Sequence, residues 1–508
     1  MPDWLKKYLP VRKSVFWPPV LLLVFALGLS TFYPDVFLGQ IKEIQAWILR
    51  NFSLPISYLS LIMVALIIWV LFSPLGNYKI GGPKAKPRLH FFSWFAIVLC
   101  TTIAVGILFW GSAEPLSHFL SPPKYLNSES GSQKSKIFAL GALYFHWGIT
   151  PYSIYAVPAL LFGLIYYAKK NRFRLSLMLV PLYPVRSNSI GSKLVDMVSL
   201  FALVTGMAAS LGAGILSLAS ALRGSFPEAN FQWLTLLVMG LIVATFVVSA
   251  STGIDRGIRR LSLFNLWFFA LFALLFIYIS WDLQPLSHIL PGLKTYASWF
   301  PDLSLQLSGK GAQWTFDWTT FNLAVWMAWA PITALFLGKI AIGRTVREFI
   351  LVNLFLPASF CVAWMGIFGG TTLELAANDP ESYRTALQNL GPESIIYQVF
   401  GDLGHLKAFS IFFGIGMFIS YVTAADSSTE AMASLSMKGK VEDEFQVNSG
   451  LKIFWGVLLG LISWVMINYS GIEGVRILSV IGGLPAFFFL SLASISLFIL
   501  SLKPNKFL

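Results

Sequence analysis

Charged side chains are scarce in this sequence. Only 12% of its 508 residues are Asp, Glu, Lys or Arg, against about 25% in soluble domains, and 56% are hydrophobic. A water-soluble surface cannot be built from this composition, which excludes a soluble enzyme or binding domain. Cysteine is also rare: Cys100 and Cys361 both lie in apolar stretches, so the chain offers no disulfide framework and no CxxC metal site.

Motifs for catalysis and for nucleic-acid binding are missing as well. We find no hydrolase triad, phosphate loop or cofactor fingerprint, so we expect neither an enzyme nor a bound cofactor. The net charge of +13 comes from short basic loops rather than from a basic domain, so no nucleic-acid partner is expected. No metal-ligand spacing is present among the five histidines, His90, His118, His146, His288 and His405.

Long uncharged stretches are abundant instead. A run of about 18 or more apolar residues predicts a membrane span, and marking the intervals between successive charges gives twelve such runs. The sequence therefore predicts an all-α polytopic membrane protein with twelve transmembrane helices. The intervals are 14–34, 52–73, 89–113, 137–168, 197–222, 229–254, 261–281, 318–338, 349–373, 408–425, 453–472 and 477–502.

The charges in the loops predict the orientation of these spans. Positive residues mark the cytoplasmic loops, and an even number of spans places both termini on the same side. The loops after even-numbered spans are basic, whereas the loop after the ninth span is acidic. We therefore expect both termini in the cytoplasm and a location in a bacterial inner membrane. The residues used are Lys79, Lys84, Lys86, Arg88, Lys339, Arg344 and Arg347 in basic loops, and Glu374, Asp379 and Glu381 in the acidic one.

No loop is long enough for a soluble domain, so function must lie within the helices. The segments 282–317 and 375–400 mix apolar residues with Pro, Gly and charge. They are consistent with short helices at the membrane interface or with ordered outer loops.

Two spans carry signs of interruption. The third ends in Gly106–Pro115, and the eighth contains Pro331 within an uncharged stretch. Broken helices at matching places in two halves indicate an inverted-repeat transporter with a binding site near the midplane. We therefore expect two N-terminal helices in 1–88, a first five-helix repeat in 89–281, an outer connector in 282–317, a second repeat in 318–502 and a short tail in 503–508.

Aromatic side chains gather in the fourth and eighth spans. Trp147, Tyr152 and Tyr155 fall within about 140° of arc on a helix, and Trp326 and Trp329 share a face at a spacing of three. These residues suit either packing or a box for a quaternary ammonium group. Such a group cannot donate hydrogen bonds but is attracted to ring faces by about 2 kcal/mol when desolvated.

The tenth span runs into Thr423-Ala-Ala-Asp426. If its helix continues to about Met437, Asp426 lies within the membrane, where a carboxylate is a functional candidate by default. The alternative is a structural carboxylate satisfied by nearby hydroxyls. Glu114, beside Pro115 at the end of the third span, is expected at the interface.

Several ordered motifs together resemble one family, the betaine/carnitine/choline transporters, over essentially the whole chain beyond the first two spans. The motifs are Trp110–Pro115, His146–Tyr155, Thr252–Ser262, Gly343–Phe349, Phe368–Gly370 and Thr423–Ser427.

The resemblance implies a LeuT-type fold of two inverted five-helix repeats after two extra helices, a homotrimer, and import of a betaine-, choline- or carnitine-like solute by alternating access. It also implies that the binding box consists of Trp147, Tyr152, Tyr155, Trp326 and Trp329. Two alternatives stay open: a carrier of another zwitterion, such as an amino acid or an ectoine-like compound, and a membrane sensor with a degenerate transporter core.

Some positions depart from the family pattern. Leu323 and Val325 stand where aromatic residues are common, and Tyr152 stands where Trp is usual. The pocket is therefore expected to be wider or tuned to another solute. The Gly-rich stretch of the third span is reduced to Thr102–Gly106, where Ala104 and Gly106 are candidate ion or gating positions.

The coupling ion stays undecided between Na⁺, H⁺ and substrate exchange. In sodium-coupled members hydroxyls line the tenth span and threonines the fifth. Here Thr423 remains, but Ala424 follows it, and Leu203 and Met207 stand on the fifth span. An Arg that replaces the ion on the fifth span is also missing before Arg223. The short C-terminal tail argues against osmotic regulation through a long basic extension.

Overall fold

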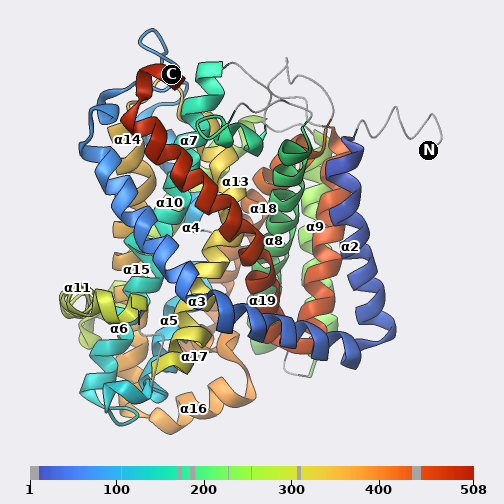
Figure 1. Ribbon diagram of the computed structural model, residues 1–508. Coiled ribbons are helices and arrows are strands. Elements are labelled where there is room, and N and C mark those ends of the chain that lie inside the picture. The colour runs from blue at the N-terminus through green and yellow to red at the C-terminus, as the bar shows by residue number, and fades with distance from the viewer. Residues whose placement is uncertain are drawn as a thin grey trace.

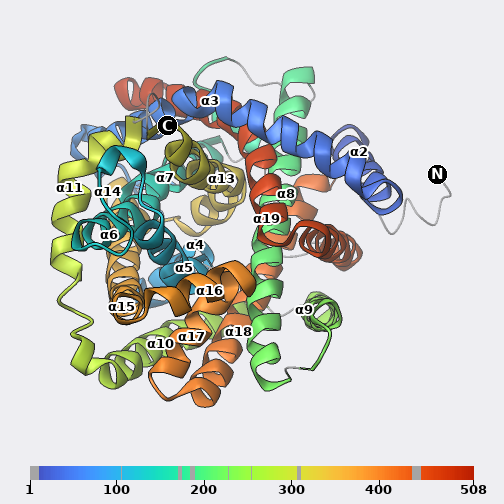
Figure 2. The same cartoon turned by 90° about the horizontal axis from the view of Figure 1, so that it is seen from below.

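The computed structural model describes residues 11–103, 106–169, 174–183, 189–226, 228–252, 255–305, 311–437 and 448–508. Within these ranges the chain is helical and has no β-strand, only isolated bridges between Val11 and Met437 and between Lys79 and Thr345. The helices form one bundle, seen from the side in Figure 1 and from one end in Figure 2. The prediction of an all-α polytopic membrane protein is confirmed.

The long helices follow the predicted spans closely. They are α2 (Lys13–Phe32), α3 (Pro34–Phe72), α4 (Phe91–Ile103), α5 (Gly106–Leu120), α6 (Gln133–Trp147), α7 (Ile149–Lys169), α8 (Ile190–Ser225), α9 (Phe231–Thr252), α10 (Asp255–Ile279), α13 (Phe321–Ile340), α15 (Leu356–Asn378), α18 (Leu406–Ser436) and α19 (Ser449–Leu502).

Shorter helical pieces connect them. They are η1 (Pro74–Asn77), η2 (Lys124–Leu126), η3 (Leu175–Leu179), η4 (Trp281–Leu283), α11 (Ile289–Leu305), α12 (Ala312–Trp314), η6 (Thr315–Thr320), α14 (Val346–Ile350), η7 (Leu351–Phe355), α16 (Pro380–Asn389), η8 (Pro392–Ser394), α17 (Ile395–Asp402) and α20 (Pro504–Phe507).

The described helices account for the predicted number of spans. Ten are long and apolar enough to cross a membrane, and the bent pair α4 and α5 makes an eleventh. At 1.5 Å per residue the 54 residues of α19 would measure about 80 Å, far more than the ~30 Å apolar core of a bilayer. This helix breaks at Gly471, whose φ is 53° and ψ −135°, so α19 supplies two spans. Twelve crossings result.

Of the two spans predicted to be interrupted, the third is broken and the eighth is continuous at the predicted residue. The third span is broken: α4 and α5 meet at 52°, but the break precedes Gly106, and Pro115 lies inside the continuous α5. The expected interruption at Pro331 is wrong, because α13 runs through this residue. A proline removes only one backbone hydrogen bond, which buried membrane helices tolerate when neighbouring groups are satisfied. The irregular turn lies earlier, in the π-helical η6.

A further break in the fourth span separates α6 from α7 at Gly148, whose φ is −99° and ψ −135°. A Cβ at this position would collide with the backbone carbonyl of Tyr144, so only glycine fits. The break places His146 and Trp147 on the last turn of α6, apart from Tyr152 and Tyr155 on α7.

Charged loops are sorted to the two ends of the bundle. The end that carries α14 and α20 holds the bridge between Lys79 and Thr345, and α16 lies at the opposite end (Figure 1). Viewed from that opposite end, α16 and α17 cross the bundle and α11 follows its edge (Figure 2). Of the two interpretations that the sequence allowed for the segments 282–317 and 375–400, short helices are the one observed.

One carboxyl group outside the spans is buried with only partial compensation. Glu393 in η8 is 8% exposed, and its Oε2 atom lacks a hydrogen-bond partner among the described residues. Burial raises the pKa of Glu393 to about 7, opposed only in part by a hydrogen bond from its own backbone N–H and by the charge of Arg223. Because the folded-state pKa is raised, stability falls as pH rises from the unfolded pKa of about 4.3, and the loss is complete above pH 7.

We therefore expect Glu393→Gln to stabilise the protein at alkaline pH, by up to about 3 kcal/mol. The gain in thermal midpoint of the detergent-purified protein should be roughly twice as large at pH 8 as at pH 5.5. Glu381→Gln, at an 82% exposed side chain, is the matched control and should show no such difference. An equal gain at both pH values would contradict the assignment.

Candidate substrate site

A cavity of about 70 Å³ lies inside the bundle, and its lining comes from α4, α5, α6, α7, α8, α13, α18 and α19. Half of its lining residues are aromatic, and the others are Thr, Ser, Gly, Ala and Val. None of the lining residues is Asp, Glu, Lys, Arg or His. The lining consists of Thr102, Gly106, Trp110, Trp147, Tyr155, Ser210, Ala213, Phe321, Val325, Trp326, Trp329, Tyr421, Val475 and Ser479.

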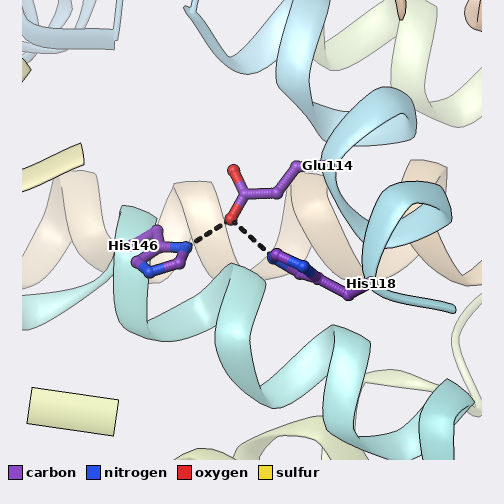
Figure 3. Close-up of side chains that lie close together, drawn as sticks. All are labelled: Glu114, His118 and His146. Atoms are coloured by element: carbon purple, nitrogen blue, oxygen red, sulfur yellow. Dashed lines mark hydrogen bonds and ion pairs between the residues drawn. The ribbon is translucent and has the colours of Figure 1, made fainter. Parts of the chain in front are cut away.

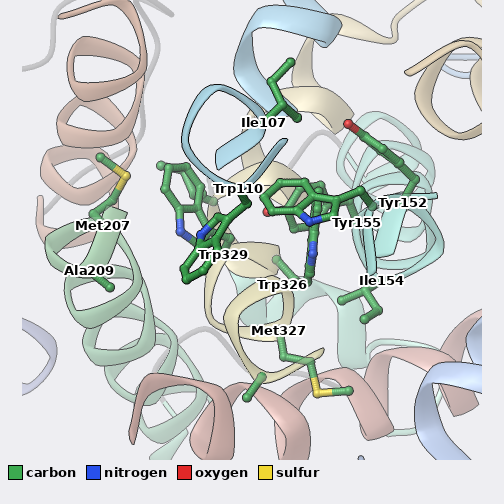
Figure 4. Packing of buried hydrophobic residues seen from close by; sticks show 14 of the residues in the cluster. Ile107, Trp110, Tyr152, Ile154, Tyr155, Met207, Ala209, Trp326, Met327 and Trp329 are labelled. Carbon is green, nitrogen blue, oxygen red and sulfur yellow. The ribbon is translucent and has the colours of Figure 1, made fainter. Parts of the chain in front are cut away.

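Four of the five residues predicted for the box line this cavity: Trp147, Tyr155, Trp326 and Trp329. The ring of Trp326 lies 5.5 Å from the ring of Trp147 at 73° and 4.8 Å from the ring of Tyr155 at 55°. Figure 4 shows Tyr155, Trp326 and Trp329 converging with Trp110 of α5. Their exposed fractions are all below a tenth, so these rings are buried inside the bundle.

Two hydrogen bonds fix the tryptophans. The indole Nε1 of Trp147 donates to Oε2 of Glu114 at 2.9 Å. The indole Nε1 of Trp326 donates to the backbone carbonyl of His146 at 3.1 Å. A buried indole N–H needs such a partner. Here one acceptor is a side chain of α5 and the other is a backbone carbonyl of α6.

Tyr152 occupies a different place from the rest of the predicted box. Its ring packs 5.3 Å from Trp326, behind the wall, and its hydroxyl lies 3.1 Å from Sγ of Cys361. Figure 4 shows its side chain directed away from the other rings. Tyr152 supports the wall and does not line it.

The small size of residue 106 is required here. A Cβ at Gly106 would overlap the ring of Trp147, so glycine allows the indole to lie directly against the backbone of α5. Ala104, the neighbouring candidate, lies outside the described residues.

Three large lining residues were missed from the sequence: Trp110, Phe321 and Tyr421. Trp110 packs edge-on against Phe321 at 6.3 Å and against Trp318 at 6.1 Å. The guanidinium of Arg476 lies 5.1 Å from the Trp318 ring centre and 5.3 Å from that of Phe321. The helical spacing gave no signal for this cluster, although Trp110 opens one of the family motifs.

The candidate ion positions lie on α18. This helix continues to Ser436, as expected, so Asp426 is within it, but the side chains of residues 426 and 427 lie outside the described part of the structure. Thr423 is 4% exposed, and its hydroxyl donates to the carbonyl of Ile419 at 2.8 Å. Leu203 and Met207 on α8 are both buried.

Glu114, which was expected at the membrane interface, is enclosed by protein. Its side chain is fully buried because α5 continues through Pro115 and packs against α6 and α15. His118, one turn further along, and His146 of α6 are buried with it. Figure 3 shows both imidazole rings directed at the same carboxylate oxygen.

The distances within this cluster are short. Nδ1 of His146 lies 2.5 Å from Oε1 of Glu114, and Nε2 of His118 lies 3.6 Å from the same atom. The three ligand-type atoms are within 4.8 Å of one another, close enough by distance alone to hold a metal ion. However, Nε1 of Trp314 donates to Nδ1 of His118 at 3.3 Å, which places the ring hydrogen of His118 on Nε2, the atom that would have to bind the metal. The cluster therefore suits hydrogen bonding better than metal ligation.

Comparison with known proteins agrees with this architecture. The model of the betaine/carnitine/choline family transporters matches residues 14–505. The chain is 30% identical to an ectoine/hydroxyectoine transporter of Virgibacillus pantothenticus, over 84% of this chain and 83% of that protein. It is 26% identical to the glycine betaine transporter OpuD of Bacillus subtilis, over 93% and 91% of the two chains.

A third relative is the osmo-independent choline transporter BetT1 of Acinetobacter baylyi, which is 27% identical over 95% of this chain and 92% of that protein. These relatives are transporters and not enzymes. Since the family model covers nearly the whole sequence, this chain belongs to the betaine/carnitine/choline transporter family.

Proposed function

We propose that this protein is a secondary active transporter that imports a quaternary-ammonium solute related to betaine, choline or carnitine. The observation that carries the proposal is the cavity walled by Trp147, Tyr155, Trp326 and Trp329 without an acidic or basic lining residue. A trimethylammonium group has no N–H to donate, so ring faces are its natural partners, whereas a primary ammonium requires acceptors.

The polar part of such a solute has partners in the same cavity. Thr102, Ser210 and Ser479 add hydroxyl groups to the lining. The hydroxyls of Thr102 and Ser479 donate to carbonyls of their own helices in this structure, to Val98 and Val475. Each is free to turn toward a solute carboxylate or hydroxyl, because a hydroxyl hydrogen rotates to suit its acceptor.

Transport by alternating access agrees with the breaks in the helices. The bend between α4 and α5, the gap at Gly148 and the break at Gly471 divide spans that reach or support the cavity. We propose that residues 89–281 and 318–502 act as the two repeats. The charge sorting of the loops favours cytoplasmic termini in a bacterial inner membrane, and family resemblance favours a homotrimer.

Ectoine is the second candidate solute. The relative with 30% identity carries ectoine and hydroxyectoine, and the lining has Val325 where family members commonly have an aromatic residue. Uptake of radiolabelled glycine betaine, choline, carnitine, ectoine and proline into proteoliposomes separates the candidates. Accumulation of any of them excludes a sensor, which would bind without accumulating.

Trp326→Ala should abolish uptake of the trimethylammonium substrate, because this ring contacts two other walls of the box. Removing one aromatic face from a desolvated cation costs about 2 kcal/mol, or about 30-fold in affinity. Trp233→Ala is the matched control, because Trp233 on α9 is 70% exposed and lies away from the cavity. Unchanged uptake by the Trp326 variant would contradict the box.

Gly106→Ala should weaken substrate binding at least tenfold by displacing the Trp147 ring. Gly240→Ala in α9 is the matched control, since its added Cβ would meet nothing within 4 Å. Equilibrium binding of the radiolabelled substrate to the purified proteins measures both. Equal affinity of the Gly106 variant and the parent protein would show that the Trp147 ring is not part of the site.

A further inference from the structure

We propose that Glu114 and His146 form a proton-binding site and that the proton held there is the coupling ion of this carrier. This inference rests on the proposed transport function and extends it to the choice of ion. It is carried by the hydrogen-bond pattern of the buried cluster and by its direct connection to the substrate box.

The carboxylate of Glu114 is surrounded by nitrogen donors. Oε2 accepts from Nε1 of Trp147 at 2.9 Å, and Oε1 faces Nδ1 of His146 at 2.5 Å and Nε2 of His118 at 3.6 Å. Glu114, His118 and His146 are all 0% exposed. A carboxylate in this position is held ionised by N–H groups, and so His146 must carry its ring hydrogen on Nδ1 when it is neutral.

Only one of the two histidines can take up a proton without losing a hydrogen bond. His118 accepts from Trp314 at Nδ1, so protonation at this atom would break that bond. His146 has Nε2 at 3.1 Å from the hydroxyl of Thr319. A hydroxyl donates to neutral imidazole and accepts from imidazolium, so His146 can gain a proton at Nε2 while Thr319 merely rotates its hydrogen.

Proton binding also balances charge. With both histidines neutral the buried cluster carries the single negative charge of Glu114. One proton from water forms one N–H bond at Nε2 of His146 and creates an ion pair with net charge zero. A neutral pair of this kind costs less to bury than a lone carboxylate.

No described cation replaces this proton. Arg476 faces the cluster, but across the ring of Trp318, which lies 4.5 Å from the His118 ring, and it pairs with Glu473 at 3.1 Å. Lys136 of α6 pairs with Glu374 of α15, and His288 lies 3.4 Å from the same carboxylate.

The remaining titratable groups on the elements around α5 and α6 form no described ion pair with the cluster. Asp196 is bound by Arg12 at 2.6 Å, Asp402 accepts from Tyr383 at 2.7 Å, and Asp317 accepts from Gln313 at 2.9 Å. The others on these elements are Tyr125, Lys134, Tyr144, Tyr152, Tyr155, Tyr166, Tyr167, Lys169, Lys193, Arg223, Lys294, Tyr296, Asp302, Cys361, Glu381, Arg384, Glu393 and Tyr397.

The same atoms hold the substrate box in shape. Glu114 anchors the indole of Trp147, and the backbone carbonyl of His146 anchors the indole of Trp326. When the proton is present, the ion pair keeps Glu114 and α6 together and both rings stay in place. Solute and proton therefore favour the same arrangement, and by linkage each increases the affinity for the other.

The test uses the purified full-length protein in proteoliposomes, with radiolabelled glycine betaine or whichever solute of the panel is taken up. In Na⁺-free potassium buffer, an acidic exterior should drive accumulation, and added solute should acidify an internal pH dye. Glu114→Gln and His146→Gln should lose both effects. Glu381→Gln, at an exposed side chain of α16 outside the cluster, is the matched control and should keep both effects.

Binding separates a proton site from a merely structural one. In the parent protein the dissociation constant of the solute should rise with pH, by at most tenfold per pH unit for one linked proton. In Glu114→Gln, which keeps an oxygen acceptor for Trp147, the dissociation constant should not change with pH. A parallel pH dependence in both proteins would overturn the assignment.

The outcomes distinguish this inference from the proposed function. Uptake by the parent protein that requires Na⁺, or that moves no protons, overturns the proton site and leaves the transport function intact. Proton movement that persists in both the Glu114 and the His146 variants also overturns the site. Failure of the parent protein to take up any solute of the panel overturns the proposed function itself.

Discussion

The burial of one carboxylate, that of Glu114, constrains the arrangement of the whole site. A carboxylate in the apolar interior needs hydrogen-bond donors on every side, and these come from Trp147 and His146 on α6, with the Nε2–H of His118 on the next turn of α5 directed at it from 3.6 Å. Meeting that need fixes α5 against α6 and sets the orientation of Trp147. The orientation of the proposed substrate box therefore depends on a polar cluster whose side chains do not line the cavity.

The neighbouring positions of His146 and Trp147 make this arrangement possible. The break at Gly148 ends α6 directly after them. His146 therefore belongs to the polar cluster, and Trp147 lines the box. Trp326 on α13 then reaches back to the His146 carbonyl, which ties the second half of the chain to the first. Because the walls come from both halves, movement of one half against the other would open or close the box.

Much of this architecture follows from the sequence, because apolar length and loop charge act locally. The spans and four of the wall positions, Trp147, Tyr155, Trp326 and Trp329, could be predicted from runs, helical spacing and family motifs. The cluster could not, since Glu114 stands beside a proline at the end of an apolar run, where interface and interior look alike. Its burial depends on contacts between α5, α6 and α12, which no local pattern encodes. The interruption predicted at Pro331 was wrong for the opposite reason. A proline is a local helix breaker, but a helix tolerates it when the surrounding groups are packed.

In the proposed box, ring faces recognise the positive charge of the solute and not merely its shape. Equilibrium binding of glycine betaine, compared with 3,3-dimethylbutanoate, in which carbon replaces the quaternary nitrogen, tests this directly because the two differ little in size. A cation held by desolvated rings gains about 2 kcal/mol, so the neutral-headed analogue should bind about 30-fold more weakly. Equal affinity for the two compounds would contradict the account.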